Sequence, residues 1–98
     1  MVEKIIWSPK AISEYEAIVD FLIRVWNENT ALKFQNLISL SISNMSKNPI
    51  SFPIVMDNIR KVVIHKNVSL YYEFKHMENT IEILSIFDSR QNPNKLKL

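Results

Sequence analysis

Apolar positions recur with a helical period through the first half of the chain. From residue 10 to residue 28 they return every three or four positions, which predicts one helix with a single buried stripe. Ser8 is a good N-cap for this helix, and Pro9 suits its first turn. A second helix is expected to start at Thr30 as N-cap and to end near residues 48–49. Two helices joined this briefly should form an antiparallel hairpin. The first stripe consists of Ile12, Tyr15, Val19, Leu22, Ile23 and Trp26.

Strand-like runs surround the helical segment. Residues 2–7 predict a first strand, and three later runs separated by short turns predict sequential antiparallel hairpins. The chain has no glycine, so Asn67 and Asn79 are expected to supply positive φ in the two later turns. The last run is apolar on both faces, which places it inside the sheet with helices covering one side. The three later runs span residues 59–66, 68–75 and 80–87.

These elements predict an α+β fold. It consists of an N-terminal strand, a helical hairpin and a three-stranded antiparallel meander, with one sheet packed on the helices. A chain of 98 residues forms one domain with a modest core. We therefore expect residues 1–98 to be a single domain, with an irregular loop at residues 49–57 and a loosely held basic tail at residues 92–98.

The composition excludes several classes of protein. Without cysteine there are no disulfides, thiolate nucleophiles or cysteine metal sites, which fits a cytoplasmic protein. No signal peptide is recognisable, and no apolar run approaches the ~20 residues that span a bilayer, so no membrane association is expected. The absence of glycine also rules out the P-loop, the dinucleotide-binding fingerprint and the nucleophile elbow.

The net charge of +2 is unevenly distributed. Residues 1–58 carry five basic and six acidic side chains, whereas residues 59–98 carry seven basic and four acidic ones. A basic strand-rich half is consistent with binding nucleic acid or an acidic protein. The competing interpretation is that these are ordinary solubilising lysines.

Two arginines are the first candidates for binding an anion. Arg60 opens the second of the predicted strands and Arg90 follows the last. In an antiparallel sheet those two ends can share one edge, which would make a two-arginine phosphate clamp. Alternatively, each arginine merely solvates a strand end or pairs with a neighbouring carboxylate, Asp57 or Asp88.

Histidines and tyrosines are the next candidates. His65 and His76 have the side chains best suited to proton transfer near neutrality, although residues beside turns are usually solvated bystanders. Tyr71 and Tyr72 are adjacent on one strand and must point to opposite faces. We expect Tyr72 in the core and Tyr71 exposed, available for base stacking or a partner, or else for cross-strand packing. No metal-ligand spacing accompanies the histidines, so neither a metal nor a cofactor is expected.

Several local sequences, taken in order, resemble a known family. The strings are W-S-P-K-A at residues 7–11, I-R at 59–60, V-S-L-Y-Y-E-F at 68–74 and I-E-I-L-S-I-F-D-S-R-Q-N-P at 81–93. Together they resemble the RelE/ParE superfamily of bacterial toxin-antitoxin systems, whose members are also described as plasmid-stabilisation proteins. The resemblance covers residues 2–95. It implies a growth-inhibiting α+β toxin that is neutralised in a hetero-oligomer by a cognate antitoxin.

The superfamily divides into ribosome-dependent mRNA endonucleases of the RelE kind and ParE-like toxins that act on DNA gyrase. RelE-like nucleases carry an arginine where this chain has Ser69, and a tyrosine or histidine where it has Asp88 and Ser89. ParE-like members are more similar at the I-R and Y-Y positions. The resemblance therefore favours a ParE-like toxin, although it does not establish gyrase as the target.

Three hypotheses follow from the resemblance. The first is a ParE-like toxin that binds its target through a basic surface, for which the candidate residues are Arg60, Lys61, Arg90 and Lys95. The second is a nuclease acting on ribosome-bound mRNA, with Arg60, Arg90, His65 and Tyr71 as the best available site. The third is a degenerate, non-toxic module that only binds antitoxin. In all three, the helical hairpin and an exposed sheet edge should receive an amphipathic helix or an added strand from the antitoxin.

Overall fold

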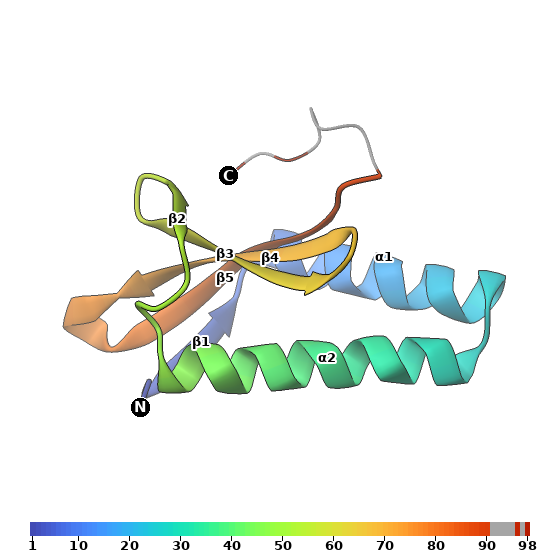
Figure 1. The fold of residues 1–98 in the computed structure, drawn as a ribbon, viewed down its shortest axis with the longest axis horizontal. Helices are drawn as coiled ribbons and strands as arrows, with labels where there is room; N and C mark the ends of the chain where they lie inside the picture. The colour runs from blue at the N-terminus through green and yellow to red at the C-terminus, as the bar shows by residue number, and fades with distance from the viewer. Residues whose placement is uncertain (91–95, 97) are drawn as a thin grey trace.

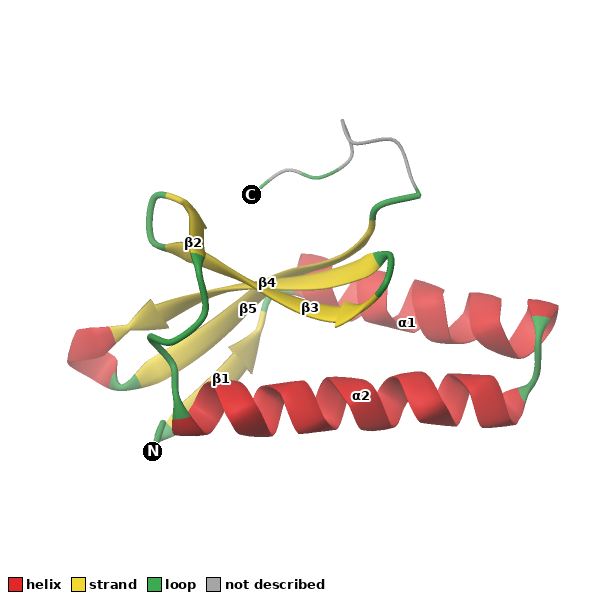
Figure 2. Cartoon of the chain, in the orientation of Figure 1, coloured by secondary structure: helices red, strands yellow, loops and turns green. Residues whose placement is uncertain are grey.

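The chain folds into one mixed sheet packed against a helical hairpin, which confirms the α+β prediction (Figure 2). The computed structural model describes residues 1–90, 96 and 98. The expected loose tail at residues 92–98 lies, apart from Leu96 and Leu98, outside the described residues. The elements are β1 (Lys4–Trp7), α1 (Pro9–Val25), α2 (Glu28–Lys47), β2 (Ile54–Met56), β3 (Ile59–His65), β4 (Val68–Lys75), a 3-10 turn η1 (His76–Glu78) and β5 (Thr80–Asp88).

Side-chain caps start both helices. The Oγ of Ser8 accepts a hydrogen bond from the backbone N–H of Ala11 at 3.0 Å, and Pro9 is the first helical residue, as predicted. The predicted cap of α2 is wrong, because the cap is Asn27 rather than Thr30. The Oδ1 of Asn27 accepts from the N–H of Thr30 at 2.8 Å. Asparagine is a stronger N-cap than threonine. With Asn27 as the cap, α2 starts earlier than predicted, and the turn between the helices is shorter.

The sheet has the strand order β1-β5-β4-β3-β2, with β1 parallel to β5 and the other pairs antiparallel. The predicted meander is present as β3, β4 and β5, and β5 lies inside the sheet as expected. The sheet nevertheless has five strands. The N-terminal strand adds one edge, and three residues of the predicted irregular loop form β2 at the other.

The turn predictions are half right. Asn79 has a φ of 48° between η1 and β5, as expected for a chain without glycine. Asn67 is not among the described residues with positive φ, whereas Asp57, in the β2–β3 turn, also has a φ of 48°. Aspartate tolerates the left-handed region almost as well as asparagine does.

Helix α1 covers the part of β5 that extends beyond β1. The N–H of Ser8 donates to the carbonyl of Ile83 at 2.9 Å, and its Oγ donates to the carbonyl of Leu84 at 3.0 Å. Further along, the Oε1 of Glu14 accepts from the Ser85 hydroxyl at 2.8 Å and from the N–H of Ile86 at 3.2 Å. These contacts satisfy backbone groups that an edge strand would otherwise leave unpaired.

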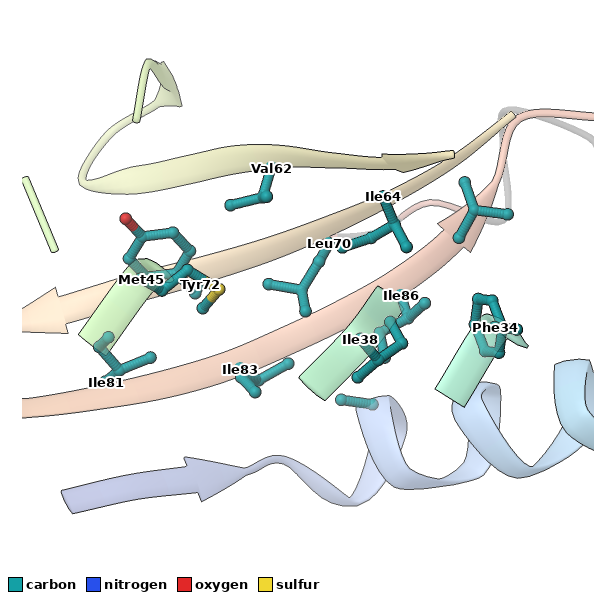
Figure 3. Packing of buried hydrophobic residues seen from close by; sticks show 12 residues of the cluster. Phe34, Ile38, Met45, Val62, Ile64, Leu70, Tyr72, Ile81, Ile83 and Ile86 are labelled. Carbon is teal, nitrogen blue, oxygen red and sulfur yellow. The ribbon is translucent and has the colours of Figure 1, made fainter. Parts of the chain in front are cut away.

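The main core lies between the hairpin and one face of the sheet (Figure 3). Phe34, Ile38 and Met45 of α2 point toward β3, β4 and β5. Tyr72 is fully buried in this core, as predicted. The sheet side of the core consists of Val62, Ile64, Val68, Leu70, Tyr72, Ile81, Ile83 and Ile86.

A second, smaller apolar cluster lies on the helix-free face of the sheet. It is formed by Ile59, Tyr71 and Phe87, with Leu84 and Leu96 packed against it. The prediction that Tyr71 is exposed is therefore wrong, because only 7% of this residue is accessible. Burial raises the pKa of the Tyr71 phenol. The alternation of side chains along β4 correctly placed Tyr71 on the sheet face opposite to that of Tyr72. It could not show that side chains of neighbouring strands and Leu96 cover that face.

No helix in the described part of the chain is both long and apolar enough to cross a lipid bilayer.

Candidate functional site

The hairpin extends beyond the end of the sheet toward the α1–α2 turn (Figure 1). A groove of about 880 Å³ lies there between the outer halves of the two helices and the sheet end formed by the β3–β4 turn and the end of β5. We call this feature the hairpin groove. It is lined by Ala17, Ile18, Phe21, Leu22, Arg24, Trp26, Thr30, Lys33, Phe34, Leu37, His65, Asn67, Val68, Asp88 and Arg90.

Much of the groove lining is apolar, and part of it is exposed. Phe21 is 42% accessible and Trp26 is 67% accessible. Trp26 belonged to the stripe predicted to be buried, as did Ile12 and Ile23. For these three residues that prediction is wrong, because Ile12 and Ile23 are each 44% accessible as well. Helical spacing identifies which side chains share a face, but the sheet ends before α1 does. The apolar face of the hairpin therefore continues into an open groove, and exposed aromatic residues of this kind mark interaction surfaces.

The charged side chains of the groove are mostly basic. Arg24 and Lys33 lie on the two helices, and Arg90 lies at the sheet end. Asp88 is the one carboxylate among the described groove residues. The groove therefore combines an apolar lining with excess positive charge, which favours an apolar, acidic occupant.

Arg90 is paired with Asp88, as the competing interpretation of this arginine expected. The Oδ1 of Asp88 accepts from the backbone N–H and the Nε of Arg90 at 2.9 and 3.0 Å. Its Oδ2 accepts from Nη2 at 2.5 Å. Hydrogen bonding by Arg90 lowers the pKa of the Asp88 carboxyl. The Arg90 side chain is still 62% accessible, whereas that of Asp88 is 13% accessible.

Arg60 has a different environment. Its Nη1 donates to the carbonyls of Ile50 and Phe52 at 3.0 and 2.7 Å. The adjacent Tyr72 hydroxyl donates to the carbonyl of Pro49 at 2.7 Å, and burial raises the pKa of Tyr72 to about 12 against the opposing effect of Arg60. Two side chains therefore hold three carbonyls of the segment between α2 and β2. Arg60 acts here as a structural arginine.

The predicted two-arginine clamp does not form. Arg60 lies opposite Tyr72, and Tyr72 lies opposite Ile83 in β5. Arg90 follows Asp88, which lies opposite Val68 at the other end of β4. The strand from Ile83 to Asp88 separates the two sites by roughly 15 Å at ~3.3 Å per residue. The order of the strands was predicted correctly, but the clamp depended on a register that the sequence does not specify.

The proposed nuclease residues do not converge either. His65 and Arg90 both line the hairpin groove. Tyr71 is buried on the helix-free face, and Arg60 holds the α2–β2 segment. An acid, a base and cations around one phosphate would require all four residues at one place.

The remaining candidates lie outside the groove. Lys61 is half-buried in β3, opposite Tyr71 in β4. His76 is exposed in η1, with its ring 4.5 Å from that of Phe74. Lys95 lies outside the described residues. Residues 1–90, 96 and 98 contain no group of three or more His, Asp or Glu side chains able to hold a metal ion.

Arg24, Lys33 and Phe21 were not among the functional residues expected from the sequence. Arg24 and Lys33 flank the α1–α2 turn, and together with the exposed aromatics they form the helical side of the groove. The one available signal was that the apolar stripe of α1 continues to its last residues, further than a short sheet can cover.

Known structures share this fold. A chain from the chromosomal ParDE toxin-antitoxin system of P. aeruginosa superposes with a TM-score of 0.73 at 20% identity, covering 89% of this chain and 96% of that one. A YoeB/ParE toxin from Agrobacterium tumefaciens gives 0.68 at 16% identity, covering 88% and 98%. A chain of the intact E. coli RelBE toxin-antitoxin complex gives 0.60 at 10% identity, covering 89% and 96%. No curated protein sequence matches the chain.

A family model supplies the sequence evidence. The model of the ParE toxin of the parDE type II toxin-antitoxin system matches residues 5–93. This match covers both helices and, apart from Lys4 at the start of β1, all five strands, and it confirms the resemblance to the RelE/ParE superfamily. The protein is therefore a toxin of a type II toxin-antitoxin system and belongs to the ParE family.

Proposed function

We propose that this toxin arrests growth in the bacterial cytoplasm by binding a protein target, DNA gyrase, and not by cutting RNA. The observation that carries the proposal is the separation of the nuclease candidates. Cleavage through a 2′-hydroxyl needs a base, an acid and cations around one phosphate. In this fold Tyr71 is buried on one face, while Arg60 lies roughly 15 Å of strand away from Arg90.

Inducible expression tests this function. Without a cognate antitoxin, induction should stop growth, and gyrase-dependent supercoiling of a reporter plasmid should fall while translation continues. Co-expression of the cognate antitoxin should restore growth. Normal supercoiling by gyrase at toxin concentrations that arrest growth would contradict the proposed target, and harmless expression would favour a degenerate antitoxin-binding module.

A ribosome-dependent endonuclease is the second candidate, because His65 and Arg90 line the same groove. It predicts codon-linked cuts in mRNA, which primer extension detects soon after induction. A His65→Gln variant should lose these cuts. Intact mRNA in arrested cells would exclude this mechanism.

We also propose that the antitoxin occupies the hairpin groove through an amphipathic helix. The groove lies between two helices, is lined by apolar side chains and has a volume of about 880 Å³. These are the properties of a surface that receives a helix by its apolar face. The similar chains from P. aeruginosa and E. coli come from a ParDE and a RelBE toxin-antitoxin system.

Substitutions at two residues with nearly equal solvent exposure test where the antitoxin binds. Phe21 and Ile23 lie on the same helix and are 42% and 44% accessible, but Phe21 lines the groove and Ile23 is not among the lining residues. Phe21→Ser should weaken antitoxin binding by about 30-fold, the usual effect of losing an aromatic hot spot. Ile23→Ser should change it by less than about threefold. Titration calorimetry with the purified antitoxin measures both, and equal losses would contradict a groove-bound partner.

A further inference from the structure

The pairing of Asp88 with Arg90 is unusual for the surface of this protein. Another ion pair on the surface, Lys75–Glu82 at 3.4 Å, is a single contact. Asp88 instead makes four hydrogen bonds to Arg90. They involve the backbone N–H, Nε and Nη2, so that both the main chain and the side chain of Arg90 are fixed.

Backbone pairing holds the part of the chain that carries this pair. Asp88 is the last residue of β5 and lies opposite Val68 at the start of β4. The N–H of Ser89 then donates to the carbonyl of Asn67 in the β3–β4 turn at 2.6 Å. The Asp88 carboxylate therefore extends from the end of a paired strand. Because the side chain is also half-buried, it has little conformational freedom, and it can hold Arg90 in one orientation.

The geometry leaves one side of the guanidinium available. Asp88 uses Nε and Nη2, and among the described residues Nη1 of Arg90 has no hydrogen-bond partner. Arg90 lines the groove together with Arg24 and Lys33. The pairing therefore does not bury the guanidinium; it fixes one edge while the side chain stays accessible at the groove.

We propose that Arg90 binds a carboxylate on the helix that occupies the hairpin groove, and that Asp88 is the positioning residue that aims the guanidinium. This inference rests on the proposed helix-binding role of the groove. It assigns the partner a chemistry: an apolar helical face bordered by glutamate or aspartate side chains. Asp88 reduces the local positive charge, yet it increases affinity because the arginine is held in place before binding and loses less rotamer freedom on binding.

The substitution Asp88→Asn separates positioning of Arg90 from simple charge attraction, because the two predict opposite changes in the affinity for an acidic helix. Asp88→Asn raises the net charge by one unit, so attraction alone predicts tighter binding of an acidic helix. Loss of the carboxylate also weakens the hold on Arg90, so positioning predicts weaker binding. Asp57→Asn is the matched control, because Asp57 is exposed, lies outside the groove lining and has a φ of 48° that asparagine tolerates.

The probes are three synthetic amphipathic helical peptides with the same leucine and phenylalanine face. Their flanking positions carry glutamate, glutamine or lysine, and fluorescence anisotropy at low and high salt measures their affinity for the full-length toxin. The unsubstituted protein should bind the glutamate peptide about 10-fold tighter than the glutamine peptide. Arg90→Gln should remove most of this preference.

The decisive comparison uses the two aspartate variants. Asp88→Asn should weaken binding of the glutamate peptide about fivefold and leave the glutamine peptide within about twofold. Asp57→Asn should leave the glutamate peptide equal or slightly tighter. Equal or tighter binding of the glutamate peptide by Asp88→Asn would overturn the positioning role, and equal affinity of all three peptides, or no binding of any, would overturn the carboxylate-binding groove. Growth arrest and gyrase inhibition are measured separately, so failure here is distinguishable from failure of the proposed toxin target.

Discussion

Replacement of Arg60 by methionine is expected to lower the free energy of unfolding by about 2–3 kcal/mol, because it removes charged-donor hydrogen bonds from the part-buried carbonyl of Phe52 and the exposed carbonyl of Ile50. The guanidinium donates to the carbonyls of Ile50 and Phe52, and methionine preserves the aliphatic stem without any donor. The segment between α2 and β2 should then loosen. Urea denaturation followed by circular dichroism measures the change, and hydrogen exchange at residues 50–56 locates it.

Lys61→Met is the matched control for this experiment. Lys61 is the next residue on β3, carries the same charge and lies on the opposite face of the sheet. Its loss should cost less than about 0.5 kcal/mol, as for most surface substitutions. If the two variants are equally stable while Arg60→Met alone loses growth inhibition, Arg60 contacts the target and the structural role is wrong.

The second large effect is expected at Glu14. Its carboxylate accepts from the Ser85 hydroxyl, which belongs to a residue with no accessible surface, and from the N–H of Ile86. Glu14→Ala leaves both donors without this acceptor and should cost about 2–3 kcal/mol. Glu16→Ala, on the exposed side of the same helix, should cost less than about 0.5 kcal/mol.

A double-mutant cycle separates the Glu14–Ser85 contact from helix propensity. Ser85→Ala removes one donor and should cost less than Glu14→Ala, since the N–H of Ile86 keeps its acceptor. The coupling between the two sites should be about 1 kcal/mol. Additive effects would mean that Glu14 acts on α1 alone and does not connect it to β5.

The two faces of the sheet are covered by different parts of the chain. One face is covered by the hairpin, while the other carries the small cluster around Tyr71 and Phe87. The hairpin groove lies beyond the end of the sheet, where the helices have no strand to cover them (Figure 1). A short sheet packed on long helices therefore leaves an apolar surface that a partner can cover, without interrupting the main core.

Local chemistry in the sequence determined the elements and their order. The cap at Ser8, the proline after it and the alternation of β3, β4 and β5 depend on residues a few positions apart, and these predictions are confirmed. Asn79 likewise takes positive φ because no glycine is present. The strings that resemble the toxin family are also local, and the family match confirms them.

The tertiary structure alone decided which residues meet. Strand register places Arg60 and Arg90 roughly 15 Å of strand apart, because a paired strand advances by ~3.3 Å per residue whatever its charges. The limited length of the sheet leaves Trp26 exposed, although its helical spacing is that of a buried residue. The pairing of β4 with β5 places Arg90 at the groove, beside helices that are more than 50 positions away in the chain. Contacts between such distant segments are set by how whole elements pack, and no short stretch of sequence encodes them.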